Sequence, residues 1–183
     1  GGFLDPDGII VIDDAAAHFL ELGGDALHVL GNHILHQHIA ACGGNGGENA
    51  PAESATEYKV AMITDYSDIT DQSFNQTSYE GCKAYCDPNG VDFNYFKPLQ
   101  DNDAERIAMV DAAVSEGHNI IVLPGFAFGP TIVECADIYP DVKFIALDVG
   151  AGDLGEGYVV PENVYCAVYQ EELAGYMAGY AAV

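Results

Sequence analysis

Short apolar runs alternate with amphipathic stretches from Tyr58 to the end of the chain. The runs predict five strands, near Lys59–Thr64, Phe93–Lys97, Asn119–Leu123, Lys143–Leu147 and Val164–Val168. The stretches between and after them predict four helices, near Ser73–Cys86, Ala104–Glu116, Thr131–Ile138 and Glu171–Ala182. In the second helix Ile107, Val110, Ala113 and Val114 recur at the three- and four-residue spacing of one buried face. This order indicates an α/β fold with a parallel sheet flanked by helices.

Polar and small residues follow three of the predicted strands. Asp65 comes after the first strand, Gly125 and Phe126 come after the third, and Asp148 comes after the fourth. Parallel α/β sheets bind ligands outside the carboxyl ends of their strands, where a carboxylate accepts hydrogen bonds from ligand N–H or hydroxyl groups. The pattern therefore predicts a small-molecule site along one edge of the sheet. The alternative is that both aspartates form turns and Phe126 packs under its loop.

The loop after the first strand carries further candidate residues. Ser73 is a suitable N-cap for the following helix, and Asp71 stands just before it, so both have a capping role as their alternative to ligand binding. Phe74 is either core filler or a flat platform for a heterocycle. Asn75 carries a donor and an acceptor on one amide, which suits it to the edge of a purine.

These loop residues resemble a known family. Asp65, Asp71, Ser73, Phe74, Asn75 and Gln76 stand as they do in the first binding loop of the basic membrane lipoprotein family. That family comprises substrate-binding lipoproteins of ABC importers, typified by purine nucleoside receptors. The similarity continues through NIIVLPGFAFG, YPDVKFIALD and NVYCAVYQEELAGYMAGYAA, which start at Asn119, Tyr139 and Asn163. It covers the chain from about Tyr58 to its end.

The resemblance implies a type I periplasmic-binding-protein-like (Rossmann-like) lobe that binds a purine nucleoside or related ligand in an interlobe cleft. It implies that Phe74 stacks on the base, that ABC importer membrane subunits are partners, and that the protein is not an enzyme. We therefore expect no catalytic residue, metal or cofactor. The implied ligand-binding residues are Asp65, Asp71, Phe74, Asn75, Gly125, Phe126 and Asp148. Because the family has two lobes and this sequence ends at Val183, in a helix interpreted as part of the first lobe, we expect a lobe truncated before the second.

The chain divides into three segments by composition. Residues 1–41 form an atypical, signal-like N-terminal segment with five of the six histidines, and residues 1–58 contain nine acidic residues and no Lys or Arg. Residues 42–57 start at Cys42, after a lipobox-like Ile39-Ala40-Ala41, and continue as a flexible linker rich in Gly, Ala and Glu. Residues 58–183 form the predicted ligand-binding lobe. Cys42 is thus a candidate lipidation site for an extracytoplasmic protein anchored to the cell membrane, and the alternative is an ordinary free thiol.

The charge of the chain excludes nucleic-acid binding. Asp and Glu number 29 against 5 Lys and Arg, a formal net charge of −24, which repels nucleic-acid phosphates. A regulator of the same fold would also need a basic DNA-binding segment upstream, and residues 1–58 have no basic residue. A surface lipoprotein without a transport role remains an alternative.

Other chemical roles have weaker support in the sequence. Asp65, Asp68 and Asp71 are candidate ligands for a hydrolytic metal, but their spacing is not that of an EF-hand, and no phosphate loop or nucleophile elbow is present. The histidines from His28 to His38 fit no zinc-finger spacing. Cys82 and Cys86 lie four residues apart on one predicted helix, a poor geometry for a disulfide, so these two and Cys135 and Cys166 are expected to be buried or free thiols.

Overall fold

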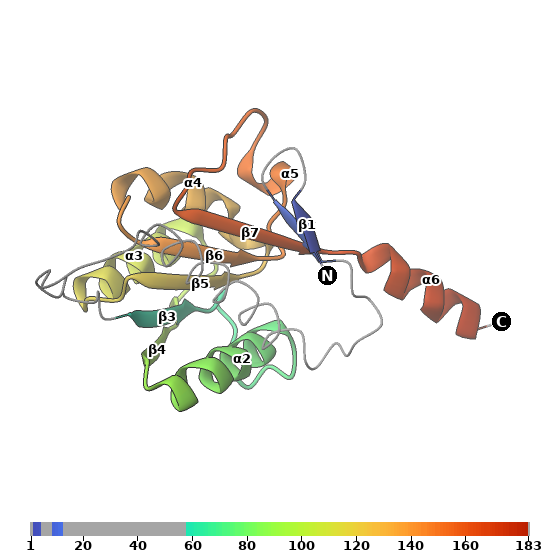
Figure 1. Ribbon diagram of the computed structural model, residues 1–183, viewed down its shortest axis with the longest axis horizontal. Helices are drawn as coiled ribbons and strands as arrows, with labels where there is room; N and C mark the ends of the chain where they lie inside the picture. The colour runs from blue at the N-terminus through green and yellow to red at the C-terminus, as the bar shows by residue number, and fades with distance from the viewer. Residues whose placement is uncertain (1, 5–8, 13–57, 183) are drawn as a thin grey trace, which may run out of the picture.

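One sheet organises the structure (Figure 1). The computed structural model describes residues 2–4, 9–12 and 58–182. Seven strands within these residues are ordered β1-β2-β7-β6-β5-β3-β4. Their bounds are β1 Gly2–Leu4, β2 Ile10–Ile12, β3 Lys59–Ile63, β4 Asp92–Phe96, β5 Ile120–Pro124, β6 Lys143–Leu147 and β7 Val164–Tyr169. All five strands predicted from Tyr58 onward are present, and neighbouring strands among them pair in parallel.

The N-terminal strands extend this sheet beyond β7. β2 pairs with β7 in parallel, with Ile10 opposite Ala167, and β1 pairs with β2 in antiparallel orientation. The sequence shows an apolar run at Ile9–Ile12 but no fold for this part of the chain, because four residues give too short a pattern to assign. The histidines from His28 to His38 and the candidate lipidation site Cys42 lie outside the described residues.

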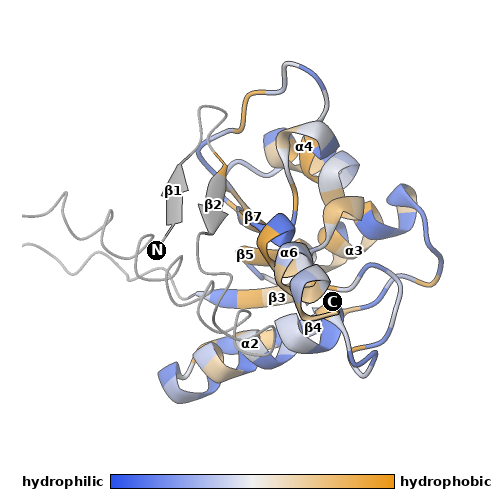
Figure 2. Cartoon of the chain, turned by 90° about the vertical axis from the view of Figure 1, so that its right-hand side faces the viewer, coloured by the Kyte–Doolittle hydropathy of each residue, from blue (hydrophilic) through white to orange (hydrophobic). Residues whose placement is uncertain are grey.

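Helices cover the sheet on both faces (Figures 1 and 2). α2 (Phe74–Asn89) lies on one face, where Met62, Cys82 and Cys86 share a core cluster. α3 (Asp103–Ser115) and α4 (Gly129–Ile138) lie on the other, around a larger core that includes Val110, Phe128, Ile132 and Phe144. This arrangement confirms the predicted α/β architecture with a parallel sheet flanked by helices.

Two short helices that the sequence did not predict follow β5 and β6. The 3-10 helix η1 (Phe126–Phe128) joins β5 to α4, and α5 (Ala151–Leu154) follows β6. Each is a single turn, which shows no recurring apolar face in the sequence. Both begin at the carboxyl edge of the sheet, so they bring extra residues to the edge where ligands are expected.

The last helix, α6 (Glu171–Ala181), extends away from the sheet (Figure 1). None of its residues is buried, and Tyr176 and Tyr180 are 73% and 80% exposed. The expected ligand-binding segment 58–183 therefore ends in a helix with no buried residue. The rest of that segment, through β7, forms the sheet and its helices.

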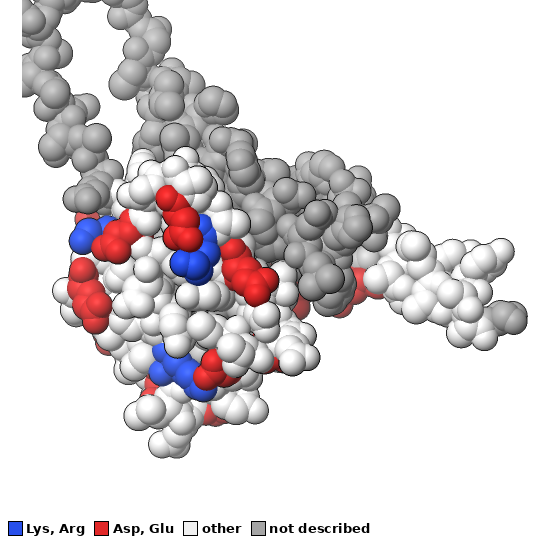
Figure 3. All heavy atoms as spheres, turned by 90° about the horizontal axis from the view of Figure 1, so that it is seen from below, with Lys and Arg blue, Asp and Glu red and all other residues white. Residues whose placement is uncertain are grey.

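Basic side chains on the lobe are mostly paired with acidic ones, as Figure 3 shows for one face. Lys59 contacts Asp92, Lys83 contacts Asp87, and Lys97 contacts Asp68, each as a salt bridge on the surface. The excess of carboxylates is thus left over after most of the few cations have been paired. Among the helices that the structure describes, none has the length and apolar character needed to cross a membrane.

Candidate functional site

The three predicted strand-end positions lie at one edge of the sheet. β6, β5 and β3 are neighbours and run in parallel, so Asp148, Gly125 and Asp65, which follow them, share the carboxyl edge. The N–H of Gly125 donates to the carbonyl oxygen of Leu147 at 2.8 Å, which ties the loop after β5 to the end of β6. Gly125 has φ 118°, a backbone conformation that a residue with a Cβ rarely adopts.

Asp65 is held in a fixed orientation by its own loop. Its Oδ1 accepts hydrogen bonds from the backbone N–H groups of Tyr66 (2.6 Å) and Ser67 (2.7 Å) and from the Asn75 amide (3.0 Å). Partial burial acts to raise the pKa of Asp65, but these hydrogen bonds outweigh it and hold the pKa below its ordinary value. Asp65 is therefore an ionised acceptor at neutral pH, and Oδ2 lies outside these three bonds.

Asn75 joins two of the predicted site residues to each other. Its side chain is buried, and Nδ2 donates to Asp65 Oδ1 and to Asp71 Oδ2, both at 3.0 Å. Its Oδ1 accepts from the backbone N–H of Asp65 at 3.4 Å. The amide therefore braces the loop in this structure, and direct contact between Asn75 and a ligand would require these bonds to be exchanged.

Asp71 caps the first turn of α2. Its carboxylate accepts from the backbone N–H groups of Ser73 (2.8 Å), Gln76 (3.1 Å) and Asn75 (3.3 Å). Ser73 occupies the N-cap position, but its side chain makes no capping hydrogen bond. The capping expected of the two residues together thus comes from Asp71, because its longer side chain reaches the exposed N–H groups from two residues upstream.

Phe74 meets a residue that the sequence analysis did not select. The ring of Phe74 lies edge-to-face against the ring of Tyr169, with centroids 6.2 Å apart and planes at 89°. Tyr169 ends β7, so the pair links the start of α2 to the other side of β6 and β5. Burial, with the nearby charge of Asp148, raises the pKa of Tyr169 to about 12, and its hydroxyl remains protonated at neutral pH.

Asp148 differs from Asp65 in its electrostatic surroundings. Burial, and then the acidic side chains of Glu171 and Asp153, raise the pKa of Asp148 above its ordinary value. Its backbone is left-handed, with φ 59°, and its N–H donates to the carbonyl oxygen of Ala167 at 2.7 Å. One edge of the sheet therefore presents two carboxyl groups whose environments favour opposite protonation states.

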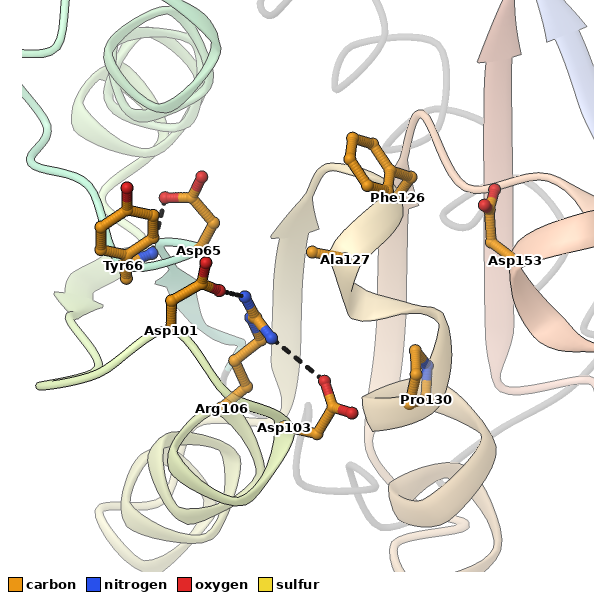
Figure 4. Close-up of a pocket in the computed structure, with 9 residues that line it drawn as sticks. All are labelled: Asp65, Tyr66, Asp101, Asp103, Arg106, Phe126, Ala127, Pro130 and Asp153. Atoms are coloured by element: carbon orange, nitrogen blue, oxygen red, sulfur yellow. Dashed lines mark hydrogen bonds and ion pairs between the residues drawn. The ribbon is translucent and has the colours of Figure 1, made fainter.

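A hollow of about 480 Å³ opens beside Asp65 at this edge (Figure 4). Asp65 and Tyr66 lie on one side of it, Phe126 lies across from them, and Phe126 is 68% exposed. The remaining lining residues are Asp101, Asp103, Arg106, Ala127, Pro130 and Asp153. The hollow thus contains two of the predicted site residues, while Asp71, Phe74, Asn75, Gly125 and Asp148 do not line it.

Arg106 forms the inner part of the hollow and is the only arginine in the chain. Its side chain is 5% exposed and forms ion pairs with Asp101 and, at 3.0 Å, with Asp103. Its guanidinium lies 5.8 Å from the centroid of the Phe128 ring. A sequence signal for it exists, because Arg106 precedes Val110 by four residues on the buried face of α3. No comparable local pattern marks Tyr169 or Asp153, which reach the edge through long-range strand order.

The structure contains no alternative metal centre in its described part. No group of three or more His, Cys, Asp or Glu side chains among the residues that the structure describes has an arrangement that would hold a metal ion. Asp68, one of the three aspartates considered for a hydrolytic metal, forms a salt bridge with Lys97 instead. Cys82, Cys86, Cys135 and Cys166 are buried free thiols whose pKa values are raised by burial.

Solved structures of transport proteins share this fold. A solute-binding protein of an ABC transporter system from Aeropyrum pernix superposes with a TM-score of 0.57 at 26% identity, over 67% of this chain and 31% of that one. A solute-binding protein from Conexibacter woesei gives 0.56 at 25% identity, over 67% and 39%. These matches support the periplasmic-binding-protein-like lobe predicted from the resemblance.

Curated relatives agree with these structures. An uncharacterised lipoprotein of Pyrococcus abyssi is 31% identical over 85% of this chain and 36% of its own length. The nucleoside-binding protein BmpA of an ABC transporter in Lactococcus lactis is 26% identical over 79% and 40%. The chain therefore spans about two fifths or less of the curated relatives that it matches.

The family model that matches the chain covers residues 58–183, which include every described residue of the sheet except those of β1 and β2 and the whole of the candidate site. This family consists of substrate-binding proteins, in agreement with the expectation that the chain is not an enzyme. The chain belongs to the Bmp family of PnrA-like ABC transporter substrate-binding proteins.

Proposed function

We propose that this chain provides one wall of a ligand-binding cleft in an extracytoplasmic substrate-binding protein of an ABC importer, and that its ligand is a purine nucleoside or a closely related compound. Family membership supports the transport role. The nucleoside is suggested by the name of the Lactococcus relative and by the chemistry at the carboxyl edge of the sheet.

The observation that carries the proposal is the combination of an ionised acceptor with an aromatic ring on one loop. Asp65 is fixed by three hydrogen bonds and has one oxygen outside them, while Phe74 is only partly buried at the start of α2. A carboxylate accepts from ribose hydroxyls or base N–H groups, and an aromatic ring stacks on a heterocycle. A nucleoside carries both kinds of group.

The remaining predicted residues have different roles in this proposal. Gly125 and Phe126 form the loop after β5 that borders the proposed cleft, and Asp148 adds a second carboxyl group at the end of β6. Asn75 and Asp71 hold Asp65 and the first turn of α2 in position. The importer membrane subunits are the proposed protein partners, and Cys42 is the proposed lipid attachment point, which holds the protein at the outer surface of the cell membrane.

Binding of adenosine, adenine and ribose to the 183-residue chain tests the proposal. We expect adenosine to raise the thermal unfolding midpoint more than either of its parts at the same concentration, because it offers ribose hydroxyls to the carboxylates in addition to a heterocycle for Phe74. At a concentration 100 times its Kd, a ligand stabilises the folded state by about 2.7 kcal/mol. Ribose acting alone as well as adenosine would favour a sugar ligand instead.

A matched pair of phenylalanine variants locates the binding. Phe74→Leu should weaken adenosine binding by about 3- to 10-fold, through loss of aromatic stacking. Phe93→Leu is the control, because Phe93 lies near the amino end of β4, away from the carboxyl edge. Its ring packs against that of Tyr79 on α2, with centroids 5.6 Å apart. Equal losses in the two variants would place the effect in the fold rather than at the ligand.

A further inference from the structure

We infer that the hollow beside Asp65 rejects phosphorylated ligands, so that the site distinguishes a nucleoside from the corresponding nucleotide by charge. This inference rests on the proposed function and adds to it the residues Asp101, Asp103 and Asp153, which neither the resemblance nor the sequence analysis assigned to the site.

The charge of the lining residues is the first observation. Four carboxylates, from Asp65, Asp101, Asp103 and Asp153, and one guanidinium, that of Arg106, line the hollow, which gives a formal charge of −3. These residues come from the loop after β3, the segment entering α3, and α5, so the negative charge surrounds the space from several sides (Figure 4). A phosphate entering it meets repulsion from more than one direction.

The single cation that lines the hollow, Arg106, is already paired with two carboxylates. Arg106 binds phosphate well only when its planar fork is free to form parallel hydrogen bonds. Here its two terminal nitrogens are paired with Asp101 and Asp103, and its side chain is 5% exposed. The guanidinium therefore compensates one negative charge while it pairs with two carboxylates, and its unpaired Nε is buried.

At the two helix starts near the hollow, one backbone position has no N–H and another N–H is already bonded. Anion sites in proteins often use N–H groups at helix N-termini. At the start of α4, Pro130 lines the hollow and has no N–H. At the start of α3, the N–H of Glu105 already donates to the Asn102 side chain at 2.9 Å. The side chains that line the hollow are thus mostly acceptors, which suits hydroxyl and amino groups on a ligand.

Asp153 is the most informative residue to change. Its Oδ2 accepts from the backbone N–H of Gly150 at 2.8 Å, a bond that asparagine preserves through its carbonyl oxygen, and it forms no ion pair with Arg106. Asp153→Asn therefore removes one negative charge and leaves the pairing of Arg106 intact. Asp103→Asn, a separate variant, also removes one negative charge and keeps Asp101 as a partner for Arg106.

Asp141→Asn is the control, because Asp141 is an exposed residue just before β6, at the opposite edge of the sheet.

Calorimetric titrations of the 183-residue chain with adenosine and adenosine 5′-monophosphate test the inference. At about 20 mM salt we expect adenosine to bind at least about 10-fold more tightly than its monophosphate. At about 0.5 M salt this ratio should shrink, because screening weakens repulsion between charges. Asp153→Asn and Asp103→Asn should each reduce the low-salt ratio by about 3-fold or more, and Asp141→Asn should leave the ratio unchanged.

The outcomes separate this inference from the proposed function. If adenosine binds and the monophosphate binds equally well, charge selection is wrong while the nucleoside assignment stands. A preference for adenosine that persists unchanged at high salt and in both Asn variants would mean steric selection and would also overturn the inference. If neither compound binds, the proposed function fails and this inference fails with it.

Discussion

Phe74 and Tyr169 lie edge-to-face with their ring centroids 6.2 Å apart, although they are 95 positions apart in the sequence. Phe74 begins α2, and Tyr169 ends β7 immediately before Gln170 and α6. The pair therefore spans the carboxyl edge of the sheet on the α2 side and ends where the chain leaves the lobe. An aromatic ring proposed to contact the ligand is positioned by a residue next to the departing helix.

A double-mutant cycle measures how strongly these rings interact. Phe74→Leu, Tyr169→Leu and the double variant should give a coupling free energy of about 0.5–1.5 kcal/mol in chemical denaturation, which is typical of an aromatic pair beyond its buried area. Tyr169→Phe is the matched control and should keep the coupling, because it retains the ring. Additive losses from the two leucine substitutions would show that the rings do not stabilise each other.

The cap of α2 gives a second prediction, in which two neighbouring polar residues behave differently. Asp71→Ala should lower the free energy of unfolding by about 1 kcal/mol, because three N–H groups in the first turn lose their acceptor. Ser73→Ala should change it by less than about half as much, because the Ser73 side chain makes no capping hydrogen bond. Urea denaturation of both variants provides the comparison, and a larger loss from Ser73→Ala would contradict the assignment of the cap.

The elements that the sequence predicts are those encoded by local patterns. Each strand from β3 to β7 except β4 is largely buried and reads as a short apolar run, such as the stretch at Ile120–Pro124. The face of α3 follows from the spacing of Val110 and Ala113, which are both buried. Because parallel strands align their carboxyl ends, strand order alone also brings Asp65, Gly125 and Asp148 to one edge.

The features of the site that the sequence does not predict depend on contacts between distant parts of the chain. Tyr169 meets Phe74, and Asp153 reaches the hollow, only because α5 and the end of β7 lie at the same edge as the loop after β3. The choice between Asp71 and Ser73 as the cap depends on side-chain reach, which residue type alone does not decide. Arg106 gives a partial signal, since a charged residue on a buried helix face requires partners, but the sequence does not show that Asp101 and Asp103 supply them.

Asp148 gives a prediction about pH. Because burial and neighbouring acids raise its pKa in the folded state, the protonated form is favoured there, and this contribution to stability is present below the unfolded pKa and is lost as pH rises through the folded pKa. Asp148→Asn should therefore raise the denaturation midpoint at pH 7 and give a smaller gain near pH 3. Asparagine also tolerates the left-handed backbone at φ 59°.

The matched control for this variant is Asp65→Asn. The pKa of Asp65 is lowered in the folded state, so its contribution is present above the unfolded pKa and is lost as pH falls through the folded pKa. Asp65→Asn should accordingly destabilise the protein at pH 7, with a smaller effect near pH 3. Urea midpoints measured across this range should move in opposite directions for the two variants at pH 7, and a shared direction would contradict the assigned environments.

Close packing between α4 and α5 leads to the last prediction. Gly129 has helical dihedrals, so an alanine there meets no backbone strain, but its Cβ would overlap the carbonyl oxygen of Asp153 and lie 2.7 Å from its carbonyl carbon. Since these are backbone atoms, α5 must shift, and Gly129→Ala should lower the free energy of unfolding by about 1–3 kcal/mol. Gly152→Ala within α5 has open space around its Cβ and should be neutral or stabilising by up to about 1 kcal/mol.

The shift of α5 caused by Gly129→Ala also displaces Asp153 from the hollow. Gly129→Ala should therefore reduce the preference for adenosine over its monophosphate, as Asp153→Asn does. A variant that loses stability but keeps the full preference would show that Asp153 does not contribute to the selection.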